Sequence, residues 1–124
     1  MKQNDPVKPQ HYLKYIIEPI AYIISQRYNF CGGNIIKYVV RFKDKNGIED
    51  LNKAEYYCNQ LIERHNDRIS CEEFCSKNNF DDITRQIITN LETYKITNNK
   101  EHLQNVLDGI KKQKSIFSST YDNK

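Results

Sequence analysis

The apolar residues between Ile48 and His65 recur at the spacing of an α-helix, and this pattern constrains the fold more than any other. They fall at every third or fourth position, so a helix gathers them on one face. They are Leu51, Ala54, Tyr57, Cys58, Leu61 and Ile62. The chain of 124 residues has only four glycines and three prolines, too few for the turns of a β-sandwich or barrel. We therefore expect an all-α fold.

Other segments show the same helical periodicity. Pro6 and Pro9 restrict the backbone before them, so residues 1–12 should form an extended arm. Ser70 and Glu73 form a capping box ahead of a short helix. The remaining helices are expected over residues 18–28, 34–42, 81–97 and 98–114, with Asn98 as the cap of the last. The sequence thus predicts a compact bundle of about five helices with an extended N-terminal arm.

Length and charge indicate how the chain is organised. Single domains usually run about 100 to 150 residues, so we expect one domain over residues 1–124. The net charge of +3 lies entirely in residues 1–65, and the remainder is neutral. We interpret residues 1–65 as the ligand-binding half, 66–114 as a helical extension and 115–124 as a flexible tail. So small a charge argues against specific DNA binding, which needs many phosphate contacts, and favours a small anion site.

The location of the protein also follows from composition. No run of about 18 apolar residues could cross a bilayer, and no signal peptide is visible, so we expect a cytoplasmic protein with no membrane partner. The four cysteines fit no disulfide framework. Combined with His65, they match no common zinc pattern, so no metal site is expected.

The segment from Phe30 to Arg41 is the most suggestive for binding. We expect Gly32 and Gly33 to form a turn just before a helix, where backbone N–H groups can bind an anion. Four residues would then share one helix face: Asn34, Lys37, Tyr38 and Arg41. At about 1.5 Å per residue this face spans roughly 10 Å, comparable to the phosphate-to-base extent of a nucleotide. The alternative is a plain turn followed by solvated basic residues. The P-loop pattern is absent.

Two further pairs could carry chemistry. His11 and Tyr12 follow the proline-containing arm, from which an imidazole and an aromatic ring could reach over the site. Glu49 and Asp50 could orient a sugar hydroxyl, bind Mg²⁺ or act as a base. Acidic residues in a first turn also stabilise a helix without any ligand, so both interpretations stay open.

Several short motifs in the first half of the chain, taken in order, resemble one family. The family consists of small phage-encoded proteins described as nucleotide kinase-like or of unknown function, and the resemblance covers about residues 4–63. Phe42 and Tyr56 depart from its usual pattern, and residues 66–124 show no resemblance. The matching motifs are Asp5-Pro6-Val7, Pro9-x-His11-Tyr12, Glu18-Pro19-Ile20, Phe30-x-x-Gly33-Asn34-x-Ile36-Lys37-Tyr38-x-x-Arg41, Lys45-x-Gly47-x-Glu49-Asp50-Leu51-x-Lys53-Ala54 and Tyr57.

The resemblance implies a nucleotide site at the matched polar positions. The positions are His11, Tyr12, Asn34, Lys37, Arg41, Lys45, Glu49 and Asp50. If the protein is an enzyme, His11 and Asp50 are the catalytic candidates, since either could position the acceptor. To these, the expected helix face adds Gly33 as a phosphate cradle and Tyr38, and either Tyr12 or Tyr38 would stack on a base.

The activity implied is that of a (deoxy)nucleoside monophosphate kinase-like phosphotransferase without a P-loop, using ATP or another phosphoryl donor, with Mg²⁺ possible but not indicated. The alternative is a non-catalytic protein that sequesters a nucleotide or cyclic nucleotide and counters host antiviral signalling in an infected bacterial cell. A helical pyrophosphohydrolase is a third hypothesis, with too few acidic residues to favour it. We also expect a homo-oligomer, because the apolar stripes exceed what short helices bury.

Overall fold

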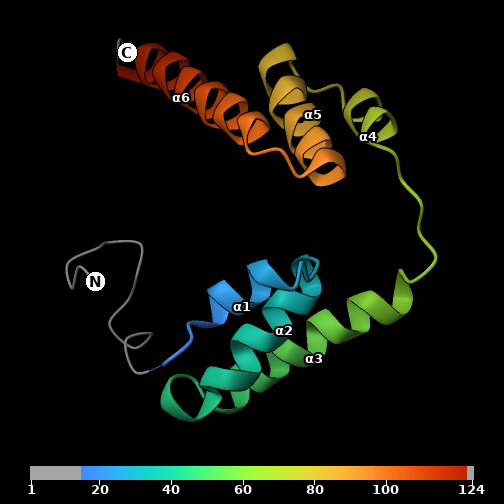
Figure 1. Ribbon diagram of the computed structural model, residues 1–124, viewed down its shortest axis with the longest axis vertical. Helices are drawn as coiled ribbons and strands as arrows, with labels where there is room; N and C mark the ends of the chain where they lie inside the picture. Colours follow the sequence, from blue (N-terminus) through green and yellow to red (C-terminus); the bar gives the residue numbers. More distant parts are fainter. Residues whose placement is uncertain (1–14, 123–124) are drawn as a thin grey trace. The chain divides into compact units, whose positions relative to one another are not determined.

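The structure, a computed structural model, describes residues 15–122 and is entirely helical in its regular elements over that range (Figure 1). Six α-helices and one short 3-10 helix occupy it, so the all-α prediction is confirmed and the expected number of helices is close. The predicted arm over residues 1–12 lies outside the described range. The chain divides into two compact units, Met1–Asp67 and Arg68–Lys124, which are described separately. The single domain expected from length stays a prediction.

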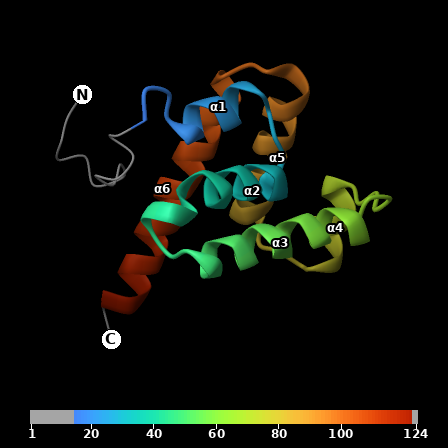
Figure 2. The same cartoon turned by 90° about the horizontal axis from the view of Figure 1, so that it is seen from below.

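The N-terminal unit is built on a pair of long helices. Helices α2 (Phe30–Arg41) and α3 (Ile48–Glu63) pack side by side, and α1 (Pro19–Ser25) packs on α2 (Figures 1 and 2). Pro19 occupies the first turn of α1, as its fixed φ angle favours. The hydroxyl of Tyr15 donates a hydrogen bond to the carbonyl oxygen of Val40 (3.0 Å), which ties the segment before α1 to the end of α2.

The start of α2 differs from the prediction. Asn29 is the N-cap, and its side-chain oxygen accepts a hydrogen bond from the Gly32 N–H (2.8 Å). The Gly33 N–H donates to the Asn29 carbonyl oxygen (2.9 Å). The predicted turn over both glycines is therefore wrong, because an asparagine N-cap starts the helix ahead of them. A Cβ on Gly33 would lie 3.0 Å from Cγ2 of Ile23, so this glycine allows α1 to approach α2.

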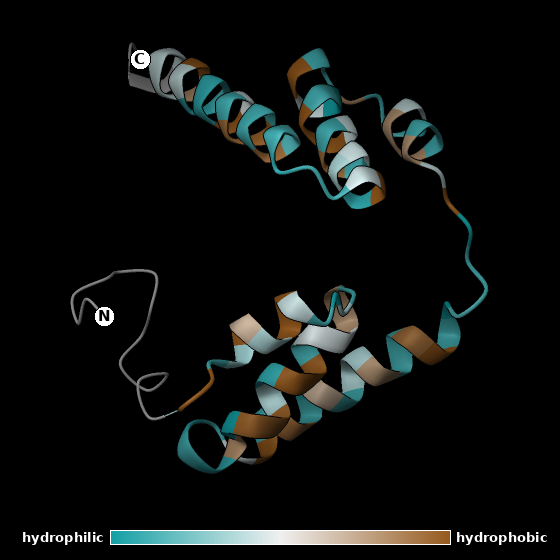
Figure 3. Cartoon of the chain, viewed as in Figure 1, coloured by the Kyte–Doolittle hydropathy of each residue, from teal (hydrophilic) through white to brown (hydrophobic). Residues whose placement is uncertain are grey.

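The connection from α2 to α3 is short and tightly turned. It contains the 3-10 helix η2 (Phe42–Asp44) and Gly47, whose φ of +54° favours glycine. Helix α3 begins at Ile48, as predicted, and ends within two residues of the predicted His65. The apolar stripe is narrower than predicted, since Cys58 and Ile62 are exposed. Figure 3 shows how hydrophobic residues alternate with hydrophilic ones along each helix.

The C-terminal unit contains α4 (Cys71–Lys77), α5 (Asp82–Thr97) and α6 (Glu101–Asp122). The Ser70 hydroxyl caps α4 by accepting from the Glu73 N–H (3.0 Å), which confirms the Ser70 half of the predicted capping box. The Glu73 carboxylate accepts from Lys77 (3.1 Å). Helices α5 and α6 form a hairpin (Figure 1). They approach closely at Gly109, where an added Cβ would lie 2.6 Å from Cγ1 of Ile87.

Two boundaries in this unit differ from the prediction. Asn98 does not begin the last helix; it ends α5 in the left-handed conformation, and Asn99 accepts from the Glu101 N–H (3.0 Å) at the start of α6. Helix α6 then continues past Lys114 to Asp122, over most of the expected tail, because no proline or glycine follows Gly109. No helix of the described range is both long and apolar enough to cross a membrane.

Candidate functional site

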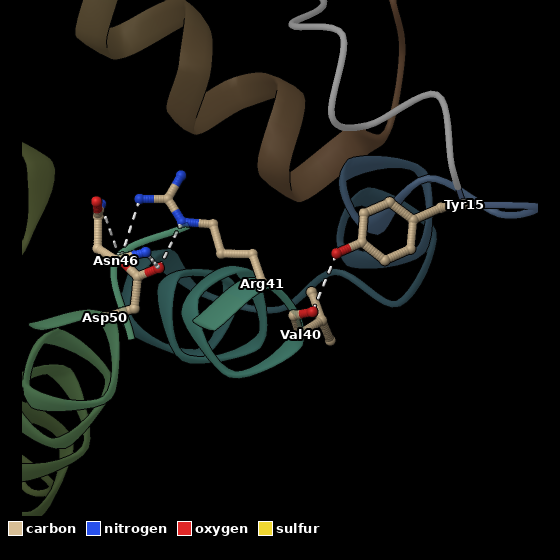
Figure 4. Close-up of polar contacts among 5 residues, drawn as sticks. All are labelled: Tyr15, Val40, Arg41, Asn46 and Asp50. Carbon is tan, nitrogen blue, oxygen red and sulfur yellow. Dashed lines mark hydrogen bonds and ion pairs between the residues drawn. The ribbon is translucent and has the colours of Figure 1, made fainter. Parts of the chain in front are cut away.

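A buried carboxylate joins α3 to the end of α2 (Figure 4). Asp50 is fully buried and accepts hydrogen bonds from Nε (3.2 Å) and Nη2 (3.3 Å) of Arg41. Asn46 donates from its backbone N–H (3.3 Å) and its side-chain amide (3.5 Å). Each carboxylate oxygen thus accepts one bond from Arg41 and one from Asn46, which gives a buried charge the partners that it needs.

The charge state of Asp50 follows from these contacts. Burial raises the pKa of Asp50, but the hydrogen bonds from Arg41 and Asn46 and the Arg41 charge outweigh it and hold the pKa below its usual value. A catalytic carboxylate must reach the proton that it moves, and the buried oxygens of Asp50 contact only Arg41 and Asn46. The arrangement is that of an anchor between helices, and it offers no access for the catalytic role that the sequence suggested.

Tyr38 is the centre of a positively charged cluster. Its side chain is 9% exposed, and its ring is nearly parallel to the ring of Tyr57 on α3, with centroids 6.2 Å apart. Three cations lie near the Tyr38 ring: Lys37 at 4.5 Å, Arg41 at 4.8 Å and Lys53 at 5.4 Å from the centroid. All three distances are within the range of cation–π attraction. The ring is therefore already in contact on several sides, and its role of stacking on a base stays a prediction.

The helix face that we assigned to a ligand is largely the face that packs against α3. Tyr38 contacts Tyr57, and Arg41 pairs with Asp50, so both point into the helix pair. The aliphatic side chains of Val39 and Val40 are 47% and 43% exposed. A tyrosine and a charge-paired arginine are thus buried against α3, although hydropathy alone would favour burial of the aliphatic face.

The other predicted residues are dispersed. The side-chain amide of Asn34 donates to the carbonyl oxygen of Phe30 in its own helix (2.9 Å). Gly33 is buried with its N–H inside the helix, so it offers no anion cradle. Lys45 and Glu49 are exposed near the start of α3. His11 and Tyr12 lie outside the described residues. Of the predicted set, Lys37, Tyr38, Arg41 and Asp50 are the ones that come together.

A pocket of about 550 Å³ lies between the first turn of α2 and the second half of α3. Its size falls within the range of about 300–1,000 Å³ that is typical of small-molecule sites. Tyr57 bridges this pocket to the charged cluster, because its ring also contacts Phe30 edge-on, with centroids 5.6 Å apart. The lining residues are Asn29, Phe30, Cys31, Tyr56, Tyr57, Gln60, Leu61, Arg64 and His65.

Sequence reasoning missed Lys53 and the pocket because both depend on which faces of α2 and α3 meet. One signal was present: Asp50, Ala54, Tyr57 and Leu61 follow one helical stripe. A carboxylate at the end of an otherwise apolar stripe predicts a buried, paired charge. Among residues 15–122, no group of three or more His, Cys, Asp and Glu side chains could hold a metal ion.

One family model matches part of the chain. Residues 7–59 match a family model described as a protein of unknown function, DUF3310. The match supports the part of the resemblance that concerns a family of unknown function, and it covers less than half of the chain. No curated protein and no solved structure matches the chain.

Proposed function

We propose that the N-terminal unit binds a nucleotide and that Lys37 and Lys53 contact its phosphate. The observation that carries the proposal is the cluster of three cations around Tyr38, in which one carboxylate, Asp50, is paired with Arg41. Lys37 and Lys53 form no ion pair with another described residue. Two half-buried lysines without a carboxylate partner among the described residues favour an anionic ligand.

The position of this cluster also suits a nucleotide. Lys53 lies one helical turn from Tyr57, whose ring lines the neighbouring pocket. A ligand with its phosphate at the lysines would thus have an aromatic surface within about 6 Å along α3. Phosphate and aromatic base are the two parts of a nucleotide, and they correspond to the cationic and aromatic parts of this surface.

We favour binding without turnover over the kinase-like activity. The buried Asp50 supports this choice, because its oxygens are engaged by Arg41 and Asn46 and cannot accept a proton from a substrate in this arrangement. The proposed role is then to sequester a nucleotide or cyclic nucleotide, which in the cytoplasm of an infected bacterial cell would counter host signalling. A kinase-like phosphotransferase with ATP as donor is the second candidate and rests on the family resemblance.

The binding test is titration calorimetry of the full chain with nucleoside mono- and triphosphates and cyclic nucleotides. A hydrogen bond to a charged group contributes about 1.5–3 kcal/mol, so Lys37→Gln and Lys53→Gln should each weaken binding by about tenfold or more. The matched control is Lys43→Gln, since Lys43 is exposed in the same unit and lies near Phe42 and not Tyr38. If the Lys43 variant weakens binding as much as the other two, the phosphate is not held at Tyr38.

A second measurement separates the two candidate functions. The protein is incubated with ATP and each nucleoside monophosphate, and products are separated by chromatography. Sequestration predicts that heat denaturation releases the ligand intact and that no diphosphate forms. Diphosphate that disappears in Lys37→Gln and Lys53→Gln would establish the kinase activity instead.

The predicted homo-oligomer belongs to the same proposal. Several isoleucines of the N-terminal unit are exposed, including Ile17 (71%) and Ile24 (67%), and exposed apolar groups favour self-association. A monomer mass by light scattering at assay concentrations would exclude a role for subunit contacts in nucleotide binding.

A further inference from the structure

We infer that the pocket between α2 and α3 receives the base of the bound nucleotide, with the ring stacking on the exposed aromatic side chains of Phe30 and Tyr56. The inference rests on the proposed nucleotide binding and adds the position of the base. It also moves base recognition away from Tyr38, where the sequence had placed it.

The aromatic side chains supply the first argument. Phe30 is 74% exposed and Tyr56 is 58% exposed, although both line the pocket. Each contacts Tyr57 edge-on, at interplanar angles of 84° and 82°. Because both side chains are mostly exposed, each keeps ring surface that a ligand in the pocket can reach. Stacking on aromatic side chains is a general way of binding a base, because every base has a π-face.

The polar residues of the pocket supply the second argument. Gln60 accepts a hydrogen bond from Nε of Arg64 (3.0 Å), and Arg64 also lies 3.7 Å from a carboxylate oxygen of Asp67. The Arg64 charge is thus compensated, in contrast to Lys37 and Lys53. A compensated, planar guanidinium stacks well on a base, so this end of the surface fits the base and the lysine end fits the phosphate.

The spacing supplies the third argument. Tyr57 lines the pocket and stacks on Tyr38, which Lys37 and Lys53 flank. From Lys53 to Gln60 along α3 is roughly 10 Å at about 1.5 Å per residue. This separation is comparable to the distance between phosphate and base in one nucleotide, so a single ligand can occupy both places.

The chain carries a native probe for this inference. Cys31 lines the pocket and is half-buried, whereas Cys58 is exposed on α3 and does not line it; both are free thiols. The rate of iodoacetamide labelling of each cysteine is measured by peptide mass spectrometry on the unmodified full chain. Adenosine, guanosine, cytidine and thymidine, which lack phosphate, are compared with inorganic pyrophosphate.

We expect at least one nucleoside to slow the labelling of Cys31 severalfold while Cys58 reacts at an unchanged rate. Pyrophosphate should leave both rates unchanged. Labelling of Cys31 that is equally fast with every nucleoside at saturating concentration, or that is slowed only by pyrophosphate, would overturn the inference.

A variant that fills the pocket distinguishes this inference from the proposed function. Leu61→Trp places a larger side chain in the pocket, and Leu61→Met is the matched control of similar volume. We expect Leu61→Trp to weaken nucleoside monophosphate binding by about tenfold or more and to leave pyrophosphate binding unchanged, with circular dichroism confirming that the variant is folded. Unchanged nucleotide affinity in Leu61→Trp, together with loss of affinity in Lys37→Gln and Lys53→Gln, would refute the base pocket and leave the proposed function standing. Unchanged nucleotide affinity in Leu61→Trp and in both lysine variants would refute the proposed function.

Discussion

The ring of Tyr38 should stabilise the N-terminal unit through contacts that an aliphatic side chain cannot replace. The parallel contact with Tyr57 contributes about 0.5–1.5 kcal/mol beyond burial. Each of the three nearby cations, Lys37, Arg41 and Lys53, adds about 0.5–1 kcal/mol at a partly exposed position. Tyr38→Leu, which keeps apolar volume but removes the ring, should therefore lower the free energy of unfolding by about 2–4.5 kcal/mol. Tyr38→Phe keeps the ring and should change it by less than about 1 kcal/mol.

Because the chain has two compact units, the assay must measure the stability of the N-terminal unit alone. Native-state hydrogen exchange at the amides of α2 and α3 measures the opening free energy of the N-terminal unit, and the amides of α5 and α6 serve as the internal control. A double-mutant cycle with Lys53→Met isolates one cation contact: in that background Tyr38→Leu should cost about 0.5–1 kcal/mol less.

Equal protection of the α2 amides in Tyr38→Leu and Tyr38→Phe would refute the reasoning, since it would mean that the ring contributes only its apolar volume. Equal loss of protection in α5 and α6 would show instead that the substitution acts on the whole chain.

Two further predictions concern ionisation and close packing. Burial raises the pKa of Asp50, but Arg41 and its other donors lower it overall. The contribution of Asp50 to stability is therefore complete above its unfolded pKa of about 4 and is lost as the pH falls through the lower folded pKa. The difference in stability between wild type and Asp50→Asn should shrink over this range, and a constant difference from pH 7 to pH 2 would contradict the prediction. Gly109→Ala gains about 1 kcal/mol of helix propensity, but it places a Cβ 2.6 Å from Cγ1 of Ile87, an overlap that costs about 1–3 kcal/mol. Urea denaturation should therefore show a net loss of stability in Gly109→Ala, and the additional substitution Ile87→Ala should relieve it. An equal loss of stability from Gly109→Ala with and without Ile87→Ala would contradict the prediction.

The helices could be predicted because their signals are local. The stripe that starts after Gly47 sets the beginning of α3, and the Ser70 cap sets the beginning of α4. The predicted start of α2 is too late, because the prediction assigns the two glycines to a turn, whereas Asn29 caps the helix ahead of them. The stabilisation that an asparagine N-cap gives to a helix offsets the low helix propensity of glycine in the first turn.

The candidate site could be predicted only in part, because its geometry depends on contacts between helices. Periodicity placed Lys37, Tyr38 and Arg41 on one face, and the structure brings them together. It could not show that this face meets α3, since the partners Asp50 and Tyr57 lie on a different helix. Aromatic stacking and a paired charge hold Tyr38 and Arg41 against α3, while the aliphatic Val39 and Val40 stay exposed.

The buried ion pair also bears on the proposed role of the lysines. The contacts of Arg41 and Asn46 with Asp50 fix the register between the end of α2 and the start of α3, and that register brings Lys53 to the Tyr38 ring. Because Asp50 is engaged by Arg41, it leaves the charges of Lys37 and Lys53 without a carboxylate partner among the described residues. One arginine that neutralises the acid thus leaves two lysines without a carboxylate partner among the described residues, which is what the proposed anion binding requires. Replacing Asp50 should alter the position of Lys53 as well as the stability of the helix pair.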